Sequence, residues 1–304
     1  MLSPKDFVSD QAAMGRAWSM ADSLTYTRWI ATGHYENFHV VSFLLPRHLH
    51  QDFYNVYAFC RWADDLGDEI GDTAESLRLL HWWREELEKM FQGEASHPVF
   101  VALLPTVRKH ALPVEPFANL ITAFEHDQKV TRYANWDEIF AYCANSANPV
   151  GRLVLGLGGY TDATRYALSD ATCTSLQLAN FWQDVSVDLQ KDRVYLPQDL
   201  LARHGVLIED VFARRFTPAF AAAMREACCV ARELFIKGSA LPPLLDPRLA
   251  LDVTLFSRGG MYILDKIEKQ GFDVLTARPY IGKGERVRLL LRTLLSFAMQ
   301  RAAA

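Results

Sequence analysis

Two clusters of acidic residues recur at helical spacing along this chain. In the first, CRWADDLGDEIGD (residues 60–72), Asp64 and Asp68 stand four positions apart. In the second, LANFWQDVSVDLQKDRVYLP (residues 178–197), Asp184 and Asp188 share that spacing, and Asn180 precedes them by one turn. Residues four apart lie on one face of an α-helix, where two carboxylates repel by about 0.2–0.5 kcal/mol. Two such pairs among apolar residues indicate a shared cation.

Magnesium suits these ligands, because it prefers oxygen donors and commonly joins one or two carboxylates to substrate phosphates. We therefore predict a Mg²⁺ site for a diphosphate or triphosphate substrate, with the metal ligands Asp64, Asp68, Asp184 and Asp188. Arg61, one turn before the first pair, and Arg193, just beyond the second, are placed to hold phosphate. The competing interpretation is that each cluster is a solvated helix end.

A carboxylate di-iron site is the rival metal chemistry, and it requires Glu-x-x-His motifs on helices. Glu36–His39 and Glu94–His97 match that pattern. However, Pro98 directly follows His97 and disfavours a helical residue there, and neither match lies in a strong helical pattern. The sequence therefore favours magnesium.

The elements that must position these side chains are helices. Apolar residues recur with a 3.6-residue period over residues 52–70, 74–92, 115–126, 136–158, 163–190, 217–238, 247–270 and 284–302. A capping-box-like stretch at residues 73–76 precedes an apolar face of Leu77, Leu80, Trp83, Leu87 and Met90. Strand-length alternation and a GxGxxG motif are both absent from the sequence. We predict one all-α domain over residues 1–304, with about eight to ten helices.

Composition and charge exclude several classes of protein. The 304 residues are 50% hydrophobic and 22% charged, which is typical of a globular chain, and the net charge of -4 gives no reason to expect nucleic acid. The five cysteines lack CxxC spacing and lie in apolar patterns, so we expect reduced core thiols. The N-terminus lacks a signal-peptide pattern, and no apolar run is long enough to span a membrane. We expect a cytoplasmic protein.

The two acidic clusters resemble those of the squalene/phytoene synthases, which are head-to-head prenyltransferases. The anchors are YAFCRWADDLGDE and LQLANFWQDVSVDLQKDRVYLP, and the resemblance extends from about Tyr35 to Leu295. It implies an isoprenoid synthase fold, a helical bundle around a central cavity, in which the four aspartates hold Mg²⁺ against a prenyl diphosphate. It also implies that the diphosphate end is lined by Arg61, Gln177, Asn180, Arg193 and Tyr195.

Two further stretches carry the resemblance. YCANSANPVGRLVLGLGGY (residues 142–160) is similar to the kinked central helix of the family, whose tunnel would be bordered by Tyr142, Ala147, Val150 and Gly151. SRGGMYILDKI (residues 257–267) resembles the helix that offers an aromatic side chain to the cationic intermediate, which makes Tyr262 the candidate. If the resemblance is set aside, the first stretch is interpreted as part of the ordinary hydrophobic core, and Tyr262 is interpreted as a core tyrosine. The resemblance assigns catalytic roles to Tyr142, Tyr195 and Tyr262.

The chain departs from the family pattern in two places. Most members carry Ser-x-Ser-Phe before the first helix pair, where this chain has Tyr35, Glu36, Asn37 and Phe38. Most also have an arginine directly before the first aspartate of the second cluster, where this chain has Gln183. The loss of the arginine and the gain of Glu36 together make the region less positive where a second diphosphate would bind. Tyr35, Asn37, Phe38 and Gln183 are candidate substrate-binding residues.

With ENF, SFLLP and ADDLGDE, the chain is most similar to the hydroxysqualene synthases of bacterial hopanoid pathways. That resemblance implies a presqualene diphosphate substrate made by a sister enzyme, Mg²⁺ as cofactor, and no NADPH. Two alternatives stay open: a synthase that condenses two farnesyl or geranylgeranyl diphosphates to presqualene diphosphate, squalene or phytoene, and an inactive helical interaction protein.

The C-terminal segment permits two interpretations. It places Arg286, Arg288, Arg292 and Arg301 beside Val287, Leu290, Leu291, Leu294 and Leu295. Such a helix can touch an anionic membrane, as a peripheral contact at the inner membrane. It can also cover the core while its basic residues face outward.

Overall fold

The computed structural model describes residues 1–33 and 46–302. Within these ranges the chain is helical and contains no strand, and the only β-type pairing is an isolated bridge between Arg132 and Val194. The predicted all-α class is therefore confirmed. The chain divides into two compact units, residues 1–129 with 149–162, and residues 130–148 with 163–304. The single continuous domain expected from the sequence stays a prediction.

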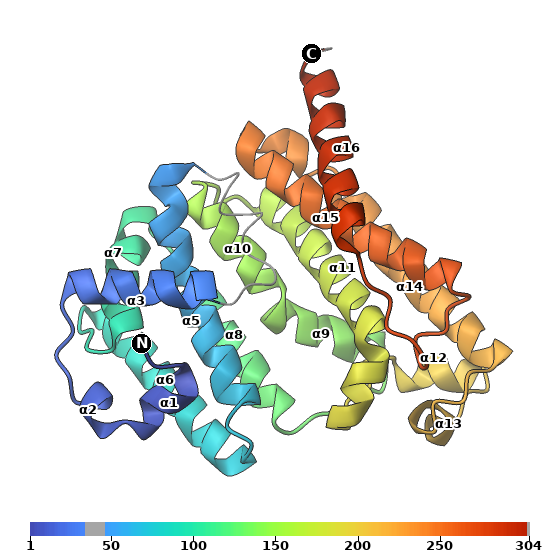
Figure 1. Ribbon diagram of the computed structural model, residues 1–304, viewed down its shortest axis with the longest axis horizontal. Helices are drawn as coiled ribbons and strands as arrows, with labels where there is room; N and C mark the ends of the chain where they lie inside the picture. The colour runs from blue at the N-terminus through green and yellow to red at the C-terminus, as the bar shows by residue number, and fades with distance from the viewer. Residues whose placement is uncertain (34–45, 303–304) are drawn as a thin grey trace. The chain divides into compact units, whose positions relative to one another are not determined.

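The first unit surrounds helix α5. Its helices are α1 (Pro4–Ser9), α2 (Gln11–Met14), α3 (Met20–Gly33), η1 (Arg47–Leu49), α5 (His50–Asp68), α6 (Thr73–Gln92), α7 (Pro98–His110), α8 (Glu115–Asp127) and most of α10 (Asn148–Leu157). Helices α3, α6, α7 and α8 all pack against α5 (Figure 1). Phe59, Trp62 and Leu66 of α5 are completely buried, and their 3.6-residue spacing explains why this apolar run is helical.

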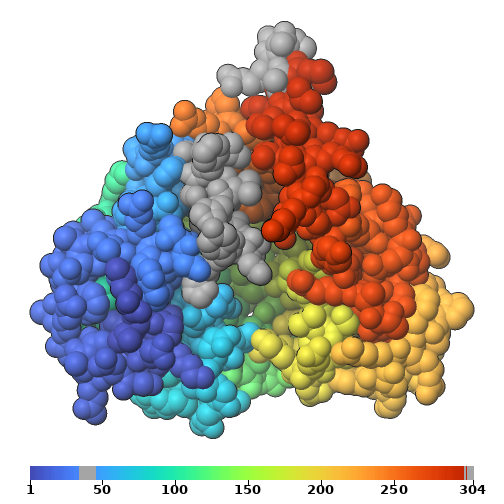
Figure 2. Space-filling model, viewed as in Figure 1, coloured from blue at the N-terminus to red at the C-terminus, as the bar shows by residue number. Residues whose placement is uncertain are grey.

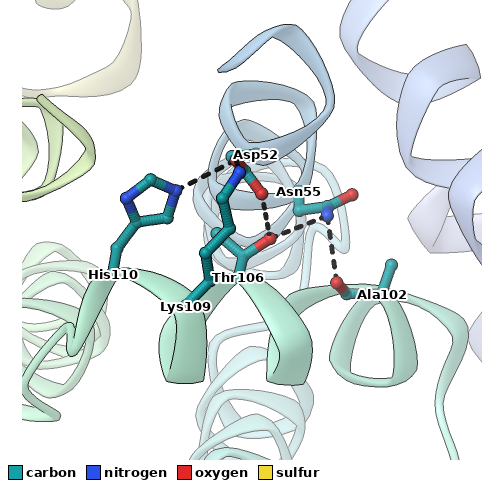
Figure 3. Close-up of polar contacts among 6 residues, drawn as sticks. All are labelled: Asp52, Asn55, Ala102, Thr106, Lys109 and His110. Atoms are coloured by element: carbon teal, nitrogen blue, oxygen red, sulfur yellow. Dashed lines mark hydrogen bonds and ion pairs between the residues drawn. The ribbon is translucent and has the colours of Figure 1, made fainter. Parts of the chain in front are cut away.

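A polar network fixes the beginning of α5 to α7 (Figure 3). The carboxylate of Asp52 accepts hydrogen bonds from Thr106 (2.9 Å) and Lys109 (2.7 Å) and lies 3.0 Å from Nε2 of His110. Asn55, one turn later, donates to the Ala102 carbonyl at 2.9 Å and to Thr106 at 3.0 Å. Burial alone would raise the pKa of Asp52, but these hydrogen bonds outweigh it and hold that pKa below its usual value. The network thereby fixes the helix that carries the first acidic cluster.

The second unit is built on the 26-residue helix α11. It contains α9 (Trp136–Ser146), α11 (Ala163–Asp188), η2 (Leu189–Lys191), α12 (Gln198–Arg203), α13 (Ile208–Phe212), α14 (Pro218–Gly238), η3 (Pro242–Leu244), α15 (Pro247–Lys269) and α16 (Lys283–Ala302). Helices α9, α14 and α15 pack against α11, and α16 packs against α15 (Figure 1). The indole of Trp182 in α11 donates to the Ala227 carbonyl of α14 at 3.1 Å. Gly260 of α15 lies where a Cβ would collide with Phe235, so α14 and α15 approach closely.

Several predicted boundaries differ from the structure. Residues 136–158 form two helices, α9 and α10, which break at Ala147 because Pro149 cannot donate a backbone hydrogen bond. This break agrees with the kinked central helix that the resemblance implies. Helix α6 is capped by Asp72, which lies in the turn after α5 and whose carboxylate accepts from the Glu75 N–H at 2.8 Å.

The described part of the chain holds fifteen α-helices, more than the eight to ten predicted. The missed ones include α3 and α7, together with the short helices α1, α2, α12 and α13. None of the five cysteines forms a disulfide, as expected, although Cys60 and Cys173 are half-buried and Cys229 is exposed rather than in the core. Among the described residues, none of the helices has both the length and the apolar character needed to cross a membrane.

Candidate active site

The first acidic cluster lies at the C-terminal end of α5, and the helix separates its acids by exposure. Asp65 is buried, whereas 43% of the Asp64 side chain is exposed and Asp68 is exposed as well. Arg61 lies 2.6 Å from the carboxylate of Asp65 and 3.3 Å from that of Asp64. Burial would lower the pKa of Arg61, but the two carboxylates outweigh it and raise that pKa. Arg61 therefore stays charged beside the predicted metal ligands.

The second acidic cluster lies at the C-terminal end of α11. The Asp184 side chain is 17% exposed and pairs with the guanidinium of Arg278. Asp188 is half-buried, and its carbonyl accepts from the backbone N–H of Arg193 at 2.9 Å, which places Arg193 just beyond η2. One and two turns before Asp184 on α11, Asn180 is exposed and Gln177 is half-buried. This unit thus brings the predicted second cluster together on one helix.

The Arg278 contact was not predicted from the sequence. Arg278 and Pro279 belong to the segment between α15 and α16, and the Gln183 amide donates to the Pro279 carbonyl at 2.8 Å. Gln183 and Asp184 therefore hold this segment against the end of α11. The sequence carries no signal for the ion pair, since 94 residues separate its partners.

An aromatic cluster accompanies the second acidic cluster. The rings of Tyr195 and Phe181 stack with centroids 3.8 Å apart, and Tyr142 lies 6.0 Å from Tyr195 and 6.1 Å from Phe181. Tyr133 completes the group at 5.7 Å from Tyr195. Tyr142 and Tyr195 were predicted from the resemblance, whereas Tyr133 and Phe181 were not. All four rings are buried, and Phe181 belongs to α11, three residues before Asp184.

Tyr262 makes a different set of contacts. Its hydroxyl donates to Glu285 at 2.8 Å, and Nζ of Lys266 lies 5.7 Å from its ring. Glu285 also accepts from Lys266 at 2.7 Å and from the Gly282 N–H at 2.8 Å, and together these hydrogen bonds lower the pKa of Glu285 to about 2. Tyr262 is half-buried rather than a core residue, and its hydroxyl is committed to Glu285.

The remaining predicted positions divide between the units and the undescribed segment. Ala147 is buried at the end of α9 in the second unit, whereas Val150 and Gly151 begin α10 in the first, where Val150 is 41% exposed. Tyr35, Asn37 and Phe38, together with Glu36, lie outside the described residues.

Comparison with known proteins settles the family. The family model for squalene/phytoene synthase matches residues 31–285. The chain belongs to the squalene/phytoene synthase family. This synthase-family protein therefore has the all-α fold of isoprenoid synthases, and it belongs to a family of prenyltransferases that act on prenyl diphosphates.

Three relatives show how similar this synthase-family protein is to known proteins. Phytoene synthase of Thermus thermophilus is 32% identical over 88% of this chain and 91% of its own length. The chloroplastic phytoene synthase of Cucumis melo is 29% identical over 84% of this chain, which spans only 62% of that protein. The crystal structure of squalene synthase HpnC from Alicyclobacillus acidocaldarius is 44% identical, with a TM-score of 0.80, over 83% of this chain and 95% of that one.

The family uses a divalent metal to bind prenyl diphosphates, and carboxylate oxygens such as those of aspartate are ligands that Mg²⁺ prefers. Among the described residues no group of three or more His, Cys, Asp or Glu side chains is arranged to hold a metal. Each helix instead offers a pair of carboxylates, and Mg²⁺ commonly takes one or two of these together with substrate phosphates and water. Asp64 and Asp68 are accessible to such an ion, and Asp184 already lies beside the cationic Arg278.

Proposed function

We propose that this protein converts presqualene diphosphate and water into hydroxysqualene and diphosphate, with Mg²⁺ held by Asp64, Asp68, Asp184 and Asp188. The observation that carries this proposal is at residue 183. The family resemblance leads us to expect an arginine there, but Gln183 is a neutral amide that donates to the Pro279 carbonyl. An amide committed to the backbone adds no positive charge for a second diphosphate. A substrate with one diphosphate therefore suits this end of α11 better than two separate prenyl diphosphates.

The relatives are named for two different products, squalene and phytoene. The chain is 44% identical to a squalene synthase HpnC and 32% identical to a phytoene synthase. The phytoene synthases favour the second candidate, which is condensation of two farnesyl or geranylgeranyl diphosphates. Family membership and the four acidic residues oppose the inactive interaction protein.

The proposed chemistry follows from the charges and rings of the two units. Bound Mg²⁺ would neutralise charge that develops on the departing diphosphate. Arg61 and Arg193 add fixed positive charge beside the two acidic clusters. As the bond from carbon to diphosphate oxygen breaks, the substrate becomes a carbocation, which the faces of Tyr142 and Tyr195 can stabilise. Water then forms the new carbon–oxygen bond, and its proton passes to diphosphate, so no reductant is consumed.

Two incubations with purified protein and Mg²⁺ test the proposal. With presqualene diphosphate and no NADPH, we expect hydroxysqualene and diphosphate, measured by mass spectrometry and by phosphate release after pyrophosphatase treatment. With farnesyl or geranylgeranyl diphosphate alone, we expect no product with a longer carbon chain. Formation of a longer product from farnesyl diphosphate alone, or from geranylgeranyl diphosphate alone, would refute the proposal in favour of condensation.

We further propose that α16 makes a peripheral contact with an anionic membrane. Val287, Leu291 and Leu295 are 56%, 54% and 65% exposed, and Figure 2 shows the atoms of α16 at the surface of the second unit. Arg288 and Arg292 are exposed on the same helix, whereas its acidic residue Glu285 is engaged by Lys266 and Tyr262. Exposed apolar residues beside basic ones are typical of helices that lie on anionic lipid. The cytoplasmic location expected from the sequence stays a prediction.

A further inference from the structure

The last turn of each acidic helix is held by a side chain from another segment of the same unit. The final four backbone carbonyls of an α-helix have no donor within the helix, so groups outside the helix must bond to them. Helix α5 ends at Asp68 and α11 ends at Asp188, so each acidic pair occupies the last turn of its helix. A donor to the carbonyls of this turn therefore helps to fix the direction of both carboxylates.

Gln128 holds the last turn of α5 in the first unit. Its side-chain amide, at the C-terminal cap of α8, donates to the carbonyl of Gly67 at 3.0 Å. Gly67 stands between Asp64 and Asp68, and Ser76 of α6 reaches the same oxygen at 3.5 Å. Gln128 is half-buried, and its amide nitrogen lies 3.5 Å from the position that a Cβ of residue 67 would take. The amide thus packs directly on the turn that carries the first acidic pair.

Arg214 makes the equivalent contact in the second unit. Its guanidinium donates through Nη2 to the carbonyl of Ser186 at 2.9 Å. Ser186 is buried and stands between Asp184 and Asp188, whereas Arg214 lies just after α13, 28 residues along the chain. The C-terminal end of a helix carries partial negative charge, so a cationic donor is favourable there.

The backbone at Arg214 indicates that this side chain has a specific role. Its φ is 52°, in the left-handed region where glycine is the usual residue at the end of a helix. The N–H of Arg214 donates to the Val211 carbonyl at 3.0 Å, and the N–H of Arg215 donates to the Asp210 carbonyl at 2.8 Å. Glycine would make the first of these bonds without strain. The turn itself therefore gives no reason for an arginine, but the contact with Ser186 does.

We infer that Gln128 and Arg214 are positioning residues for the two pairs of metal ligands. The inference rests on the metal ligands of the proposed function. Each side chain holds the carbonyl between two aspartates, so that both carboxylates of the pair stay on one face of an intact turn. If that turn frays, the second aspartate rotates away from the first, and the pair binds Mg²⁺ less tightly. Outer groups that orient metal ligands typically change metal affinity by about 10- to 100-fold.

Gln128→Met and Arg214→Gly test the inference, with binding of magnesium diphosphate measured by isothermal titration calorimetry. Methionine keeps the length of Gln128 without its donor. Arg214→Gly should unfold at about the urea concentration of wild type, because the backbone strain that it relieves offsets the lost hydrogen bond. We nevertheless expect the affinity of each variant to fall about tenfold, and the Mg²⁺ concentration for half-maximal turnover to rise by the same factor. Arg214→Lys keeps a cationic donor and should recover most of the affinity.

Gln51→Met and Arg165→Met are the matched controls, because each removes a donor to a backbone carbonyl at the opposite end of the same helix. Gln51 of α5 donates to the Leu24 carbonyl at 3.3 Å, and Arg165 of α11 donates to the Leu244 carbonyl at 2.9 Å. Both controls should bind magnesium diphosphate within about twofold of wild type.

The outcomes separate the positioning role from the proposed function. Wild-type affinity in Gln128→Met or Arg214→Gly would remove that residue from the role, and an equal loss in the controls would overturn the role altogether. A wild-type protein that binds no magnesium diphosphate would refute the metal ligands, and the positioning role with them. If wild type binds magnesium diphosphate but does not consume presqualene diphosphate, the proposed reaction fails while the positioning role stands.

Discussion

Replacing Asp252 by asparagine should stabilise the protein, and the gain should depend on pH. Asp252 of α15 is only 3% exposed, and among the described residues neither of its side-chain oxygens has a hydrogen-bond partner, so burial raises its pKa to about 8. An unfolded chain releases the proton near the ordinary value of 3.8. Between these values the folded state binds the extra proton, so its free energy of unfolding decreases as pH rises. The destabilisation is absent below pH 3.8 and complete above pH 8. Asparagine does not titrate in this range, so the Asp252→Asn variant does not undergo this pH-dependent destabilisation.

The magnitude follows from the two pKa values. At pH 7, which is 3.2 units above 3.8, the destabilisation at 1.36 kcal/mol per unit reaches about 4 kcal/mol. At pH 5 the same calculation gives about 1.6 kcal/mol. Asp252→Asn should therefore exceed wild type by roughly these amounts in the free energy of unfolding, because the amide remains as poorly paired as the protonated acid.

Urea unfolding followed by circular dichroism at pH 5, 6, 7 and 8 measures this difference. Asp265→Asn is the control, because Asp265 lies on the same helix but is 46% exposed and paired with Arg232. It should change stability by less than about 1 kcal/mol and show no comparable pH trend. If the stability difference between Asp252→Asn and wild type does not grow with pH, Asp252 is not a buried neutral acid in solution.

Three further predictions concern the metal ligands, the α5 network and α16. Asp64→Ala and Asp184→Ala should each abolish turnover of presqualene diphosphate while far-UV circular dichroism stays unchanged; retained turnover in either would remove that residue from the metal site. Asp52→Asn should lower the free energy of unfolding at pH 7 by about 2–3 kcal/mol, because it weakens charged hydrogen bonds to Lys109 and His110. Since the pKa of Asp52 is lowered on folding, that difference should shrink as pH falls below 3.8, and a constant difference would contradict the assignment. Leu291→Glu with Leu295→Glu should reduce co-sedimentation with phosphatidylglycerol vesicles by about tenfold, whereas Ile236→Glu, at an exposed apolar residue of α14, should not. Loss of a dimer in place of vesicle binding would instead identify a second copy of the chain as the partner of α16.

The sequence predicted what depends on local periodicity. Helices α5, α6, α11, α14 and α15 lie within two residues of their expected bounds, because each buries one continuous apolar stripe. Helix α7 was not predicted, and it contains two prolines, Pro98 and Pro105. The structure places Pro98 in the first turn, where no N–H is required, and retains Pro105 inside the helix.

The contacts that cross long stretches of sequence could not be predicted. No residue near Arg278 in the sequence indicates that it pairs with Asp184. Asp252 lies in the stretch LDVTLF, and the sequence does not show whether its side chain is buried or faces solvent. Whether a carboxyl group is buried without a partner depends on the neighbours supplied by other helices. One sequence and its periodicity contain no such information.

The acidic run after Phe59 shows how one helix gives similar side chains different roles. Each step along an α-helix rotates the side chain by about 100°, so neighbouring acids face different surroundings. Asp65 turns inward to Arg61, while Asp64 and Asp68 lie on the accessible face. Asp72 leaves the helix altogether and caps α6. Arg61 neutralises the inward carboxylate, and the two outward carboxylates are the pair accessible to a metal ion. The i,i+4 spacing, rather than the number of acids, is therefore what carries the metal hypothesis.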